Sequence, residues 1–324
     1  MLSREDLLAF DHSGKFLYPI GRKGQGPGEY LRTIDIFTNT DKSTIFISDA
    51  RKMLEYDFHG TFIKSFPNPN IDNRRVTQCA YVGEDVFVGQ FNNKGKYIHK
   101  YCLFDRNGDT VKCFPNYFLL DMTYFPQYTS LNPIRTDDCI YLKDYVNDTV
   151  YNLVNRDLRP AYIFGLGKPQ ENIESLASMH IYIMSMIGTP DHFFYCMHIP
   201  ESFPRPKSKK VFDVLSKEFV SWDAPVYGIY NISANTNILL DTDNDLQRGI
   251  INDINGGLPI FPRYYAGKNV VVDIWYPEEM KEMLTDEYFE KQTIKDKEGH
   301  NKLKALLKNL KEDDNPVVVV AKLK

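Results

Sequence analysis

The sequence predicts an all-β fold, a six-bladed β-propeller, because one turn motif recurs along the chain. Asp-x-x-Gly between two apolar runs begins at Asp11, Asp57 and Asp105, at intervals of 46 and 48 residues. The carboxylate of such an Asp caps the turn, and the glycine adopts the positive φ that closes a hairpin. An interval of this size holds about four short strands, which is one propeller blade. The high content of aromatic residues, 21 Tyr and 21 Phe, fits pleated sheets.

The strand-like runs between these turns divide the chain into blades. One further interval leads to Asn155-Arg156-Asp157, where we expect a looser turn, and a fifth equivalent turn is expected within residues 211–220. The predicted blades two to five are residues 33–66, 77–114, 123–165 and 180–221. Blade six takes its strands from residues 258–265, 270–275 and 317–321. We expect a single domain over residues 1–324.

The first blade is expected to be incomplete at the N-terminus. Residues 7–10 and 15–20 supply only its outer half, with no inner strands before them. A ring of blades must close to hide its edge strands, because open edges expose unpaired backbone groups. We therefore expect that the N-terminus has been shortened or that its assigned start is late.

A helical insertion is expected in the last blade, over about residues 277–311. Pro277 followed by two glutamates is typical of a helix N-terminus, and apolar residues follow at helical spacing. Leu303, Leu307 and Leu310 belong to a second amphipathic segment. The stripe favours packing against the propeller, with a groove that docks a protein partner as the alternative.

Composition excludes several classes of function. A formal net charge of −4 gives no reason to expect nucleic acid as a partner. No apolar stretch approaches the ~20 residues of a membrane-spanning helix, and the first residues lack the pattern of a signal peptide. We expect either a cytoplasmic protein or a chain whose true beginning is absent.

The five cysteines form no CxxC pair, and their odd number excludes a complete disulfide framework. Cys102 and Cys113 flank the third Asp-x-x-Gly turn and could face each other across a hairpin. Small apolar core thiols are the favoured interpretation.

Several motifs together resemble a known family. They are the glycine-rich run IGRKGQGPGEY at residues 20–30, residues 45–49, residues 56–64, and the closing segments 252–257, 261–262 and 312–324. They resemble the NHL-type repeat and, more closely, the six-bladed β-propeller lipoproteins of gut-dwelling Gram-negative anaerobes. The resemblance implies a periplasmic or cell-surface location, although this chain lacks the family's usual export signal and lipid-attachment cysteine. It implies a fold more firmly than an activity.

No local motif predicts catalysis, a cofactor or a metal. The glycines of residues 20–30 are followed by a strand, whereas a phosphate-binding loop leads into a helix. His192 and His198 are too far apart along a strand to share one ion. The run Asp241, Asp243 and Asp245 lacks the glycine and the final Glu of a calcium loop, so we favour a solvated acidic turn. A site assembled from separate blades would escape such motifs.

The remaining candidate is a ligand site at the mouth of the central channel, where loops of all blades gather. Aromatic rings can stack on sugars or peptide planes while Arg and Gln bind hydroxyls or carboxylates. The predicted site residues are Arg22, Lys23, Tyr30, Arg32, Arg51, Gln127, Tyr128, Arg263 and Tyr264. For each of them, ordinary packing at a strand end is the alternative.

These observations predict a non-catalytic binding or scaffold propeller of the cell envelope. The expected partner is a polar small molecule, a glycan, a peptide or an envelope protein. The alternative is a metal-assisted propeller enzyme, such as a lactonase-like hydrolase or a lyase. Such an enzyme needs three or four converging carboxylates or imidazoles, whereas a binder presents aromatic and amide groups.

Overall fold

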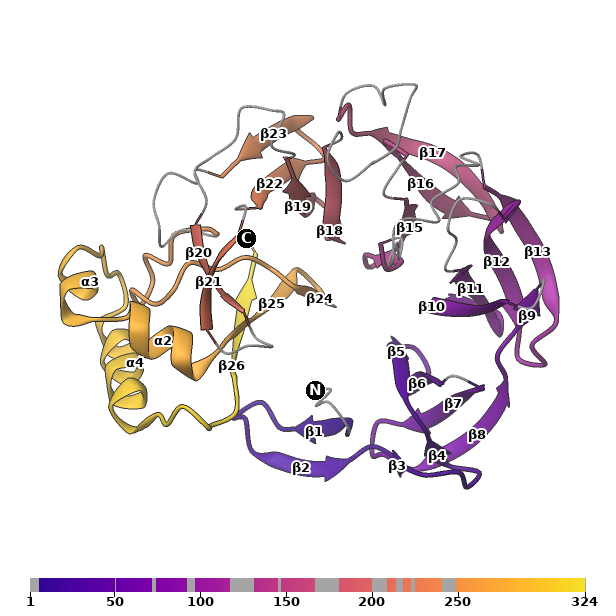
Figure 1. Ribbon diagram of the computed structural model, residues 1–324, viewed down its shortest axis with the longest axis horizontal. Helices are drawn as coiled ribbons and strands as arrows, with labels where there is room; N and C mark the ends of the chain where they lie inside the picture. Colours follow the sequence, from indigo (N-terminus) through magenta and orange to yellow (C-terminus); the bar gives the residue numbers. More distant parts are fainter. Residues whose placement is uncertain are drawn as a thin grey trace. The chain divides into compact units, whose positions relative to one another are not determined.

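The computed structural model describes residues 6–49, 51–71, 74–91, 97–116, 131–144, 147–166, 181–199, 209–213, 218–222, 225–240 and 249–323. The chain forms two compact units, the first from residues 1–134 and 139–165 and the second from residues 135–138 and 166–324. Each unit is built mainly of antiparallel sheets (Figure 1), and the fold is all-β and propeller-like. Among the described residues no helix has the length and apolar character needed to cross a membrane.

The first unit contains successive meanders in which each strand pairs with the next along the chain. The sheet orders are β5-β6-β7-β8, β13-β12-β11-β10-β9 and β14-β15-β16-β17, and β1-β2 and β3-β4 form two smaller sheets. The strands are β1 (Leu8–Phe10), β2 (Phe16–Pro19), β3 (Arg22–Lys23), β4 (Glu29–Tyr30), β5 (Thr33–Asn39), β6 (Thr44–Asp49), β7 (Lys52–Asp57), β8 (Phe62–Pro67), β9 (Asn70–Ile71), β10 (Arg74–Gly83), β11 (Val86–Phe91), β12 (His99–Asp105), β13 (Thr110–Pro115), β14 (Ile134–Arg135), β15 (Ile140–Lys143), β16 (Thr149–Val154) and β17 (Asp157–Ile163).

The three predicted Asp-x-x-Gly turns are confirmed and share one geometry. In each turn the Asp Oδ1 atom accepts hydrogen bonds from two backbone N–H groups, at distances of 2.8–3.0 Å. The three glycines have φ values of 79–83°, a region that side chains disfavour. At the looser turn, Asn155 and Arg156 both have positive φ values, as a two-residue hairpin between right-twisted strands requires.

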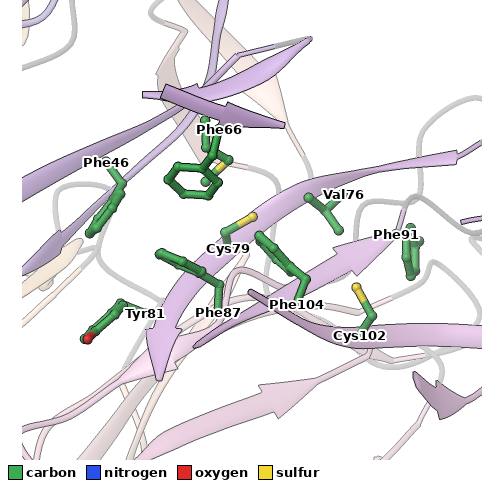
Figure 2. Packing of buried hydrophobic residues seen from close by; sticks show 10 residues of the cluster. Phe46, Phe66, Val76, Cys79, Tyr81, Phe87, Phe91, Cys102 and Phe104 are labelled. Atoms are coloured by element: carbon green, nitrogen blue, oxygen red, sulfur yellow. The ribbon is translucent and has the colours of Figure 1, made fainter. Parts of the chain in front are cut away.

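The core of the first unit lies between neighbouring sheets. Phe46 and Phe66 from β6 and β8 pack against Phe87 of β11, with ring centroids 5.2 and 5.3 Å apart, and Phe87 stacks on Phe104 of β12 (Figure 2). A second cluster joins β10–β13 to β15–β17 through Leu142. Cys102 and Cys113 are directly opposite each other in the β12–β13 register, as predicted.

The glycine-rich run forms a braced loop. Glu29 accepts a hydrogen bond from the backbone N–H of Gly26 (2.8 Å) and one from the Nε of Arg22 (2.6 Å). A Cβ atom on Gly24 would lie 2.0 Å from Glu29 Oε2, so any other residue there would displace the Glu29 carboxylate. Glu29 therefore anchors the loop between β3 and β4.

The second unit corrects the prediction for blade five. The strands at residues 182–188 and 192–198 lie within the predicted blade, but residues 209–213 and 218–222 form a separate hairpin, and two later strands complete the sheet β18-β19-β22-β23. The strand that hydrogen-bonds to β19 continues the sheet, wherever it lies in the sequence. The regular spacing of turns therefore cannot reveal a hairpin inserted between β19 and β22. The strands are β18 (Tyr182–Gly188), β19 (His192–His198), β20 (Lys209–Asp213), β21 (Glu218–Trp222), β22 (Val226–Asn231) and β23 (Thr236–Leu239).

The last sheet of the second unit has the order β24-β25-β26, with three helices in the chain between β25 and β26. Its first strand begins later than predicted, because residues 258–262 contribute only one isolated bridge, at Ile260. Its elements are β24 (Tyr264–Gly267), β25 (Val270–Trp275), α2 (Pro277–Met283), α3 (Asp286–Glu290), α4 (Lys297–Asn309) and β26 (Val317–Lys322).

The helices pack on this sheet through their leucine stripe. Leu303 and Leu310 are buried in one cluster with Trp275 of β25 and Met280 of α2, and Leu307 packs against that cluster. The stripe is therefore not exposed as one face, which removes the support that the partner-docking alternative needed. Thr285 and Asp296 cap α3 and α4 by accepting backbone hydrogen bonds.

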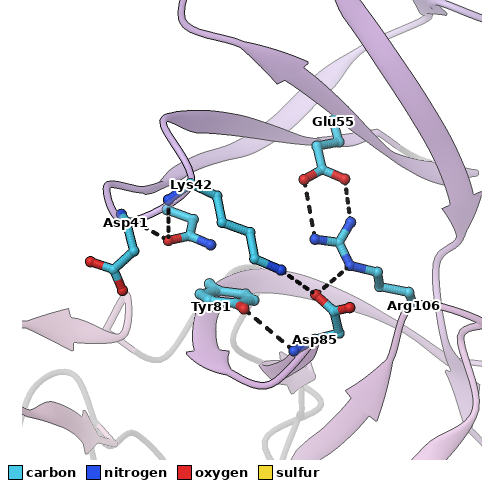
Figure 3. Close-up of polar contacts among 7 residues, drawn as sticks. Asp41, Lys42, Glu55, Tyr81, Asp85 and Arg106 are labelled. Atoms are coloured by element: carbon cyan, nitrogen blue, oxygen red, sulfur yellow. Dashed lines mark hydrogen bonds and ion pairs between the residues drawn. The ribbon is translucent and has the colours of Figure 1, made fainter.

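A buried ion pair crosses between two sheets of the first unit. Arg106, at the turn after β12, makes a two-pronged contact with Glu55 of β7, and its Nε lies 2.8 Å from Asp85 (Figure 3). The side chains of Arg106 and Glu55 are only 13% and 4% exposed. The guanidinium also lies within 6.0 Å of the Phe46 and Phe66 ring centroids.

Asp35 links two further strands of the first unit. Its Oδ2 accepts a hydrogen bond from the backbone N–H of Cys79 on β10 (2.8 Å), and its Oδ1 accepts one from Ile36 (2.9 Å). Burial raises the pKa of Asp35 to about 7, against the opposing effect of these two hydrogen bonds. The carboxyl is therefore half-protonated near neutral pH.

Replacing Arg106 by Gln should lower the free energy of unfolding by about 2–4 kcal/mol, because Glu55 would remain buried without its partner. Chemical denaturation measures the loss. Lys112→Gln is the matched control, since Lys112 and Asp157 are both exposed and such a pair contributes less than about 1 kcal/mol. Equal losses of unfolding free energy in Arg106→Gln and Lys112→Gln would contradict a special role for the buried Arg106–Glu55 pair.

Asp35 should make the protein less stable as pH rises from about 4 to 7. Its pKa is above the ordinary value of 3.8, so in this window the folded state holds a proton that the unfolded state has released. Unfolding free energy then falls by up to about 1.4 kcal/mol per pH unit. The contribution of Asp35 to the free energy of unfolding is fully present below pH 3.8 and is lost as the pH rises through about 7.

Asp35→Asn should remove this part of the pH dependence. Denaturation at several pH values should show the variant gaining stability relative to the native protein between pH 4 and 7. The exposed Asp313→Asn serves as the control and should follow the native curve. A constant difference between Asp35→Asn and the native protein across the window would disprove the raised pKa.

Candidate functional site

A pocket of about 410 Å³ lies within the second unit, bordered by the β18–β19–β22 sheet and by residues around β25. This volume falls in the ordinary range of small-molecule sites. Its lining combines aromatic, hydroxyl, thiol and charged side chains. The lining residues are Ser185, Ile187, Phe194, Cys196, Tyr227, Phe261, Pro262, Arg263, Asp273 and Tyr276.

Strand register brings the sheet residues of the pocket together. Ser185 of β18 is directly opposite Cys196 of β19, which is directly opposite Tyr227 of β22. Ile187 and Phe194 form the next pair on the same face. Residues two apart along a strand share a face, so these side chains form one continuous wall.

Asp273 organises the other side of the pocket. Its Oδ1 atom accepts hydrogen bonds from the Arg263 Nε (3.0 Å) and from the backbone N–H of Ile274 (2.8 Å). Its Oδ2 atom accepts one from the backbone N–H of Phe261 (3.0 Å). Asp273 is only 5% exposed, so three donors hold a buried carboxylate in one orientation.

The Arg263 guanidinium is hydrogen-bonded through its Nε edge. Its side chain is 37% exposed, and its guanidinium carbon lies 6.0 Å from the centre of the Tyr276 ring. Within the described residues, its two terminal nitrogens make no hydrogen bond. The guanidinium can therefore donate two parallel hydrogen bonds to a planar anion.

The aromatic side chains form an apolar surface beside this charged pair. Phe261 lies 4.5 Å from Tyr227 and 6.2 Å from Phe194 between ring centroids. Burial raises the pKa of the neighbouring Cys196 thiol to about 12, although hydrogen bonds with Ser185 and Tyr227 oppose this shift. The thiol is protonated at neutral pH and is a poor nucleophile.

The structure brings one sequence-predicted site residue, Arg263, into this pocket, and it places the others elsewhere or leaves them outside the described residues. Tyr264 is 58% exposed at the start of β24. Gln127 and Tyr128 lie outside the described residues, as does the acidic run 241–245. Their roles in ligand binding stay predictions.

The predicted residues of the first unit divide into exposed and buried ones. Arg22, Lys23, Arg32 and Arg51 are exposed, and Arg22 is paired with Glu29. Tyr30 is 1% exposed in a core cluster, and its hydroxyl accepts a hydrogen bond from the backbone N–H of Leu7 (3.2 Å). The structure gives Tyr30 the packing role that was its alternative.

Sequence reasoning missed most of the pocket, including Ser185, Phe194, Cys196, Tyr227, Phe261, Asp273 and Tyr276. One signal was available: Asp273 interrupts the otherwise apolar strand Val270–Trp275. A carboxylate in such a strand requires a buried partner, and Arg263 stands before the same hairpin. The remaining residues come together only through strand pairing.

No group of three His, Cys, Asp or Glu side chains in the described ranges could hold a metal ion. His192 Nε2 lies 3.0 Å from the Asn231 side-chain amide, and the His198 ring lies 4.9 Å from that of Tyr182. Each imidazole therefore has a local structural neighbour.

One comparison with a solved structure supports the fold. A putative exported protein of Bacteroides fragilis superposes with a TM-score of 0.68 at 17% identity, covering 99% of this chain and 86% of that one. A DUF4221 family member from Bacteroides vulgatus gives a TM-score of 0.46 at 8% identity, over 73% of this chain and 80% of that one. The WD40 domain of Neurospora crassa Pan2 gives 0.37 at 11% identity, over 69% and 55%.

No curated protein matches the sequence. The family described as "Domain of unknown function (DUF4934)" matches residues 1–322. This match covers nearly all of the 324 residues, and the chain therefore belongs to the DUF4934 family.

Proposed function

We propose that the protein is a non-catalytic binding module of the cell envelope, a single-domain six-bladed propeller lipoprotein that takes a polar ligand into the pocket of its second unit. The observation that carries the proposal is the combination of Arg263, fixed by a buried carboxylate, with the aromatic surface around Phe261. A glycan, a peptide or a segment of an envelope protein offers the matching polar groups and flat faces.

The chemistry of the lining favours binding over catalysis. The Cys196 thiol is protonated because burial raises its pKa to about 12. All three hydrogen bonds to Asp273 come from fixed donors, so this carboxylate is occupied and poorly suited to act as a general base. The pocket thus offers positioned donors and apolar surface, which are the elements of recognition.

The envelope location is supported by comparison. The Bacteroides fragilis protein that covers 99% of this chain is described as a putative exported protein. The glycine-rich run at residues 20–30 and the closing segment at 312–324 resemble those of exported propeller lipoproteins. An exported module needs a ligand site that solvent can reach, and the exposed Arg263 side chain makes this pocket accessible.

Filling the pocket should abolish ligand binding. Ser185 is exposed at the pocket wall, so Ser185→Trp should occupy the space with little cost to folding. A glycan and peptide array identifies a ligand of the native protein, and calorimetry should then show affinity reduced at least about tenfold in the variant. Thr110→Trp, at an exposed position of β13, is the control and should bind normally.

Two results would count against this function. Undiminished binding by Ser185→Trp would locate the ligand site outside the pocket. Chemical turnover of a bound glycan or peptide by the native protein would contradict the non-catalytic role.

A further inference from the structure

Arg263 sets the chemical class of the ligand. We propose that the pocket binds an acidic sugar, whose carboxylate is held end-on by the two terminal nitrogens of Arg263. This inference rests on the proposed binding function of the same pocket. It goes further by naming the recognised group and the residue that recognises it.

The end-on geometry follows from how Arg263 is held. The Asp273 carboxylate accepts a hydrogen bond from the Nε edge of the guanidinium, at 3.0 Å. It also accepts hydrogen bonds from the backbone N–H groups of Phe261 and Ile274, which fix its orientation. The terminal edge stays available at the pocket. A guanidinium already oriented in this way loses little entropy when it binds a carboxylate in a two-pronged manner.

The charge balance favours a monoanion. Among the described residues that line the pocket, Arg263 is the one basic side chain and Asp273 the one acidic side chain. The pair is neutral as a whole, so a bound dianionic phosphate would leave a net charge of about −2 in the pocket, whereas a carboxylate would leave about −1. A carboxylate brings one charge and matches the planar fork of Arg263.

The rest of the lining matches a sugar ring. Tyr227 and Phe261 lie 4.5 Å apart and offer ring surface to the apolar face of a pyranose. The hydroxyl-bearing residues Ser185, Tyr227 and Tyr276 line the same space, and a hydroxyl can both donate and accept hydrogen bonds. The volume of about 410 Å³ accommodates a small sugar.

The test compares two sugars that differ only in the acidic group. Calorimetric titration of the native protein with D-galacturonate and with D-galactose should show the acid binding at least about tenfold tighter, as hydrogen bonds to charged groups contribute more than neutral ones. Equal affinities would overturn the proposal without any variant being needed.

Variants then assign the recognition to Arg263. Arg263→Gln should weaken galacturonate binding about 10- to 100-fold and should leave galactose within about threefold. Arg263→Lys keeps the charge but loses the planar fork, so it should recover only part of the affinity. Arg159→Gln, an exposed arginine of β17 outside the pocket, should bind galacturonate like the native protein. Thermal melts confirm that each variant is folded.

The remaining outcomes separate this proposal from the proposed function. If benzoate or N-acetylaspartate binds as tightly as galacturonate, the assignment to a sugar is overturned. If Ser185→Trp abolishes binding of a neutral glycan but galacturonate shows no preference, the binding function stands and the acidic-sugar proposal falls. If Ser185→Trp binds every probe normally, both fall.

Discussion

Apolar packing between neighbouring sheets is the constraint on which the rest of the first unit depends. A four-stranded meander has two faces and cannot shield both by itself. Phe46 and Phe66 close one such interface against Phe87, with their ring centroids 5.2 and 5.3 Å from that of Phe87, in edge-on and tilted arrangements that aromatic rings favour. The polar link from Arg106 to Glu55 crosses the same interface, so charge pairing and ring packing fix one alignment of the two sheets.

The second unit also packs aromatic rings between its elements, but a pocket remains beside them. Its four-stranded sheet meets the segment before β24 through the aromatic rings of Phe194, Tyr227 and Phe261, and the pocket lies beside these rings. A buried carboxylate and a partly exposed guanidinium stand at its border. Of these two aromatic interfaces, the one around Phe87 is a packed core cluster, whereas the one around Phe261 borders a pocket.

The sequence predicted the local parts of the fold well, for a physical reason. An Asx turn is encoded by a few adjacent residues, so Asp11, Asp57 and Asp105 could be recognised without any tertiary information. The capped α4 and its leucine stripe are local in the same sense. The outer strands of blade five depend on a pairing between β19 and β22 across more than 25 residues, which no short pattern records.

The candidate site was less predictable for the same reason. Ser185, Cys196 and Tyr227 become neighbours only through two strand pairings, and each is unremarkable in its own segment. Arg263 was found because its residue type suits ligand contact, whereas Tyr30 has an equally suitable type and is buried against Leu7. Residue type identifies candidates, but burial decides among them.

The hairpin β20–β21 is inserted in the chain between β19 and β22, two strands of the pocket wall. The chain leaves β19 at His198 and re-enters the sheet at Val226, next to the Cys196–Tyr227 pair of the pocket wall. β22 pairs with β19 along its whole length across this excursion, and lengthening such an excursion costs little chain entropy. A change in the length of this excursion should therefore leave the paired strands of the pocket wall in register.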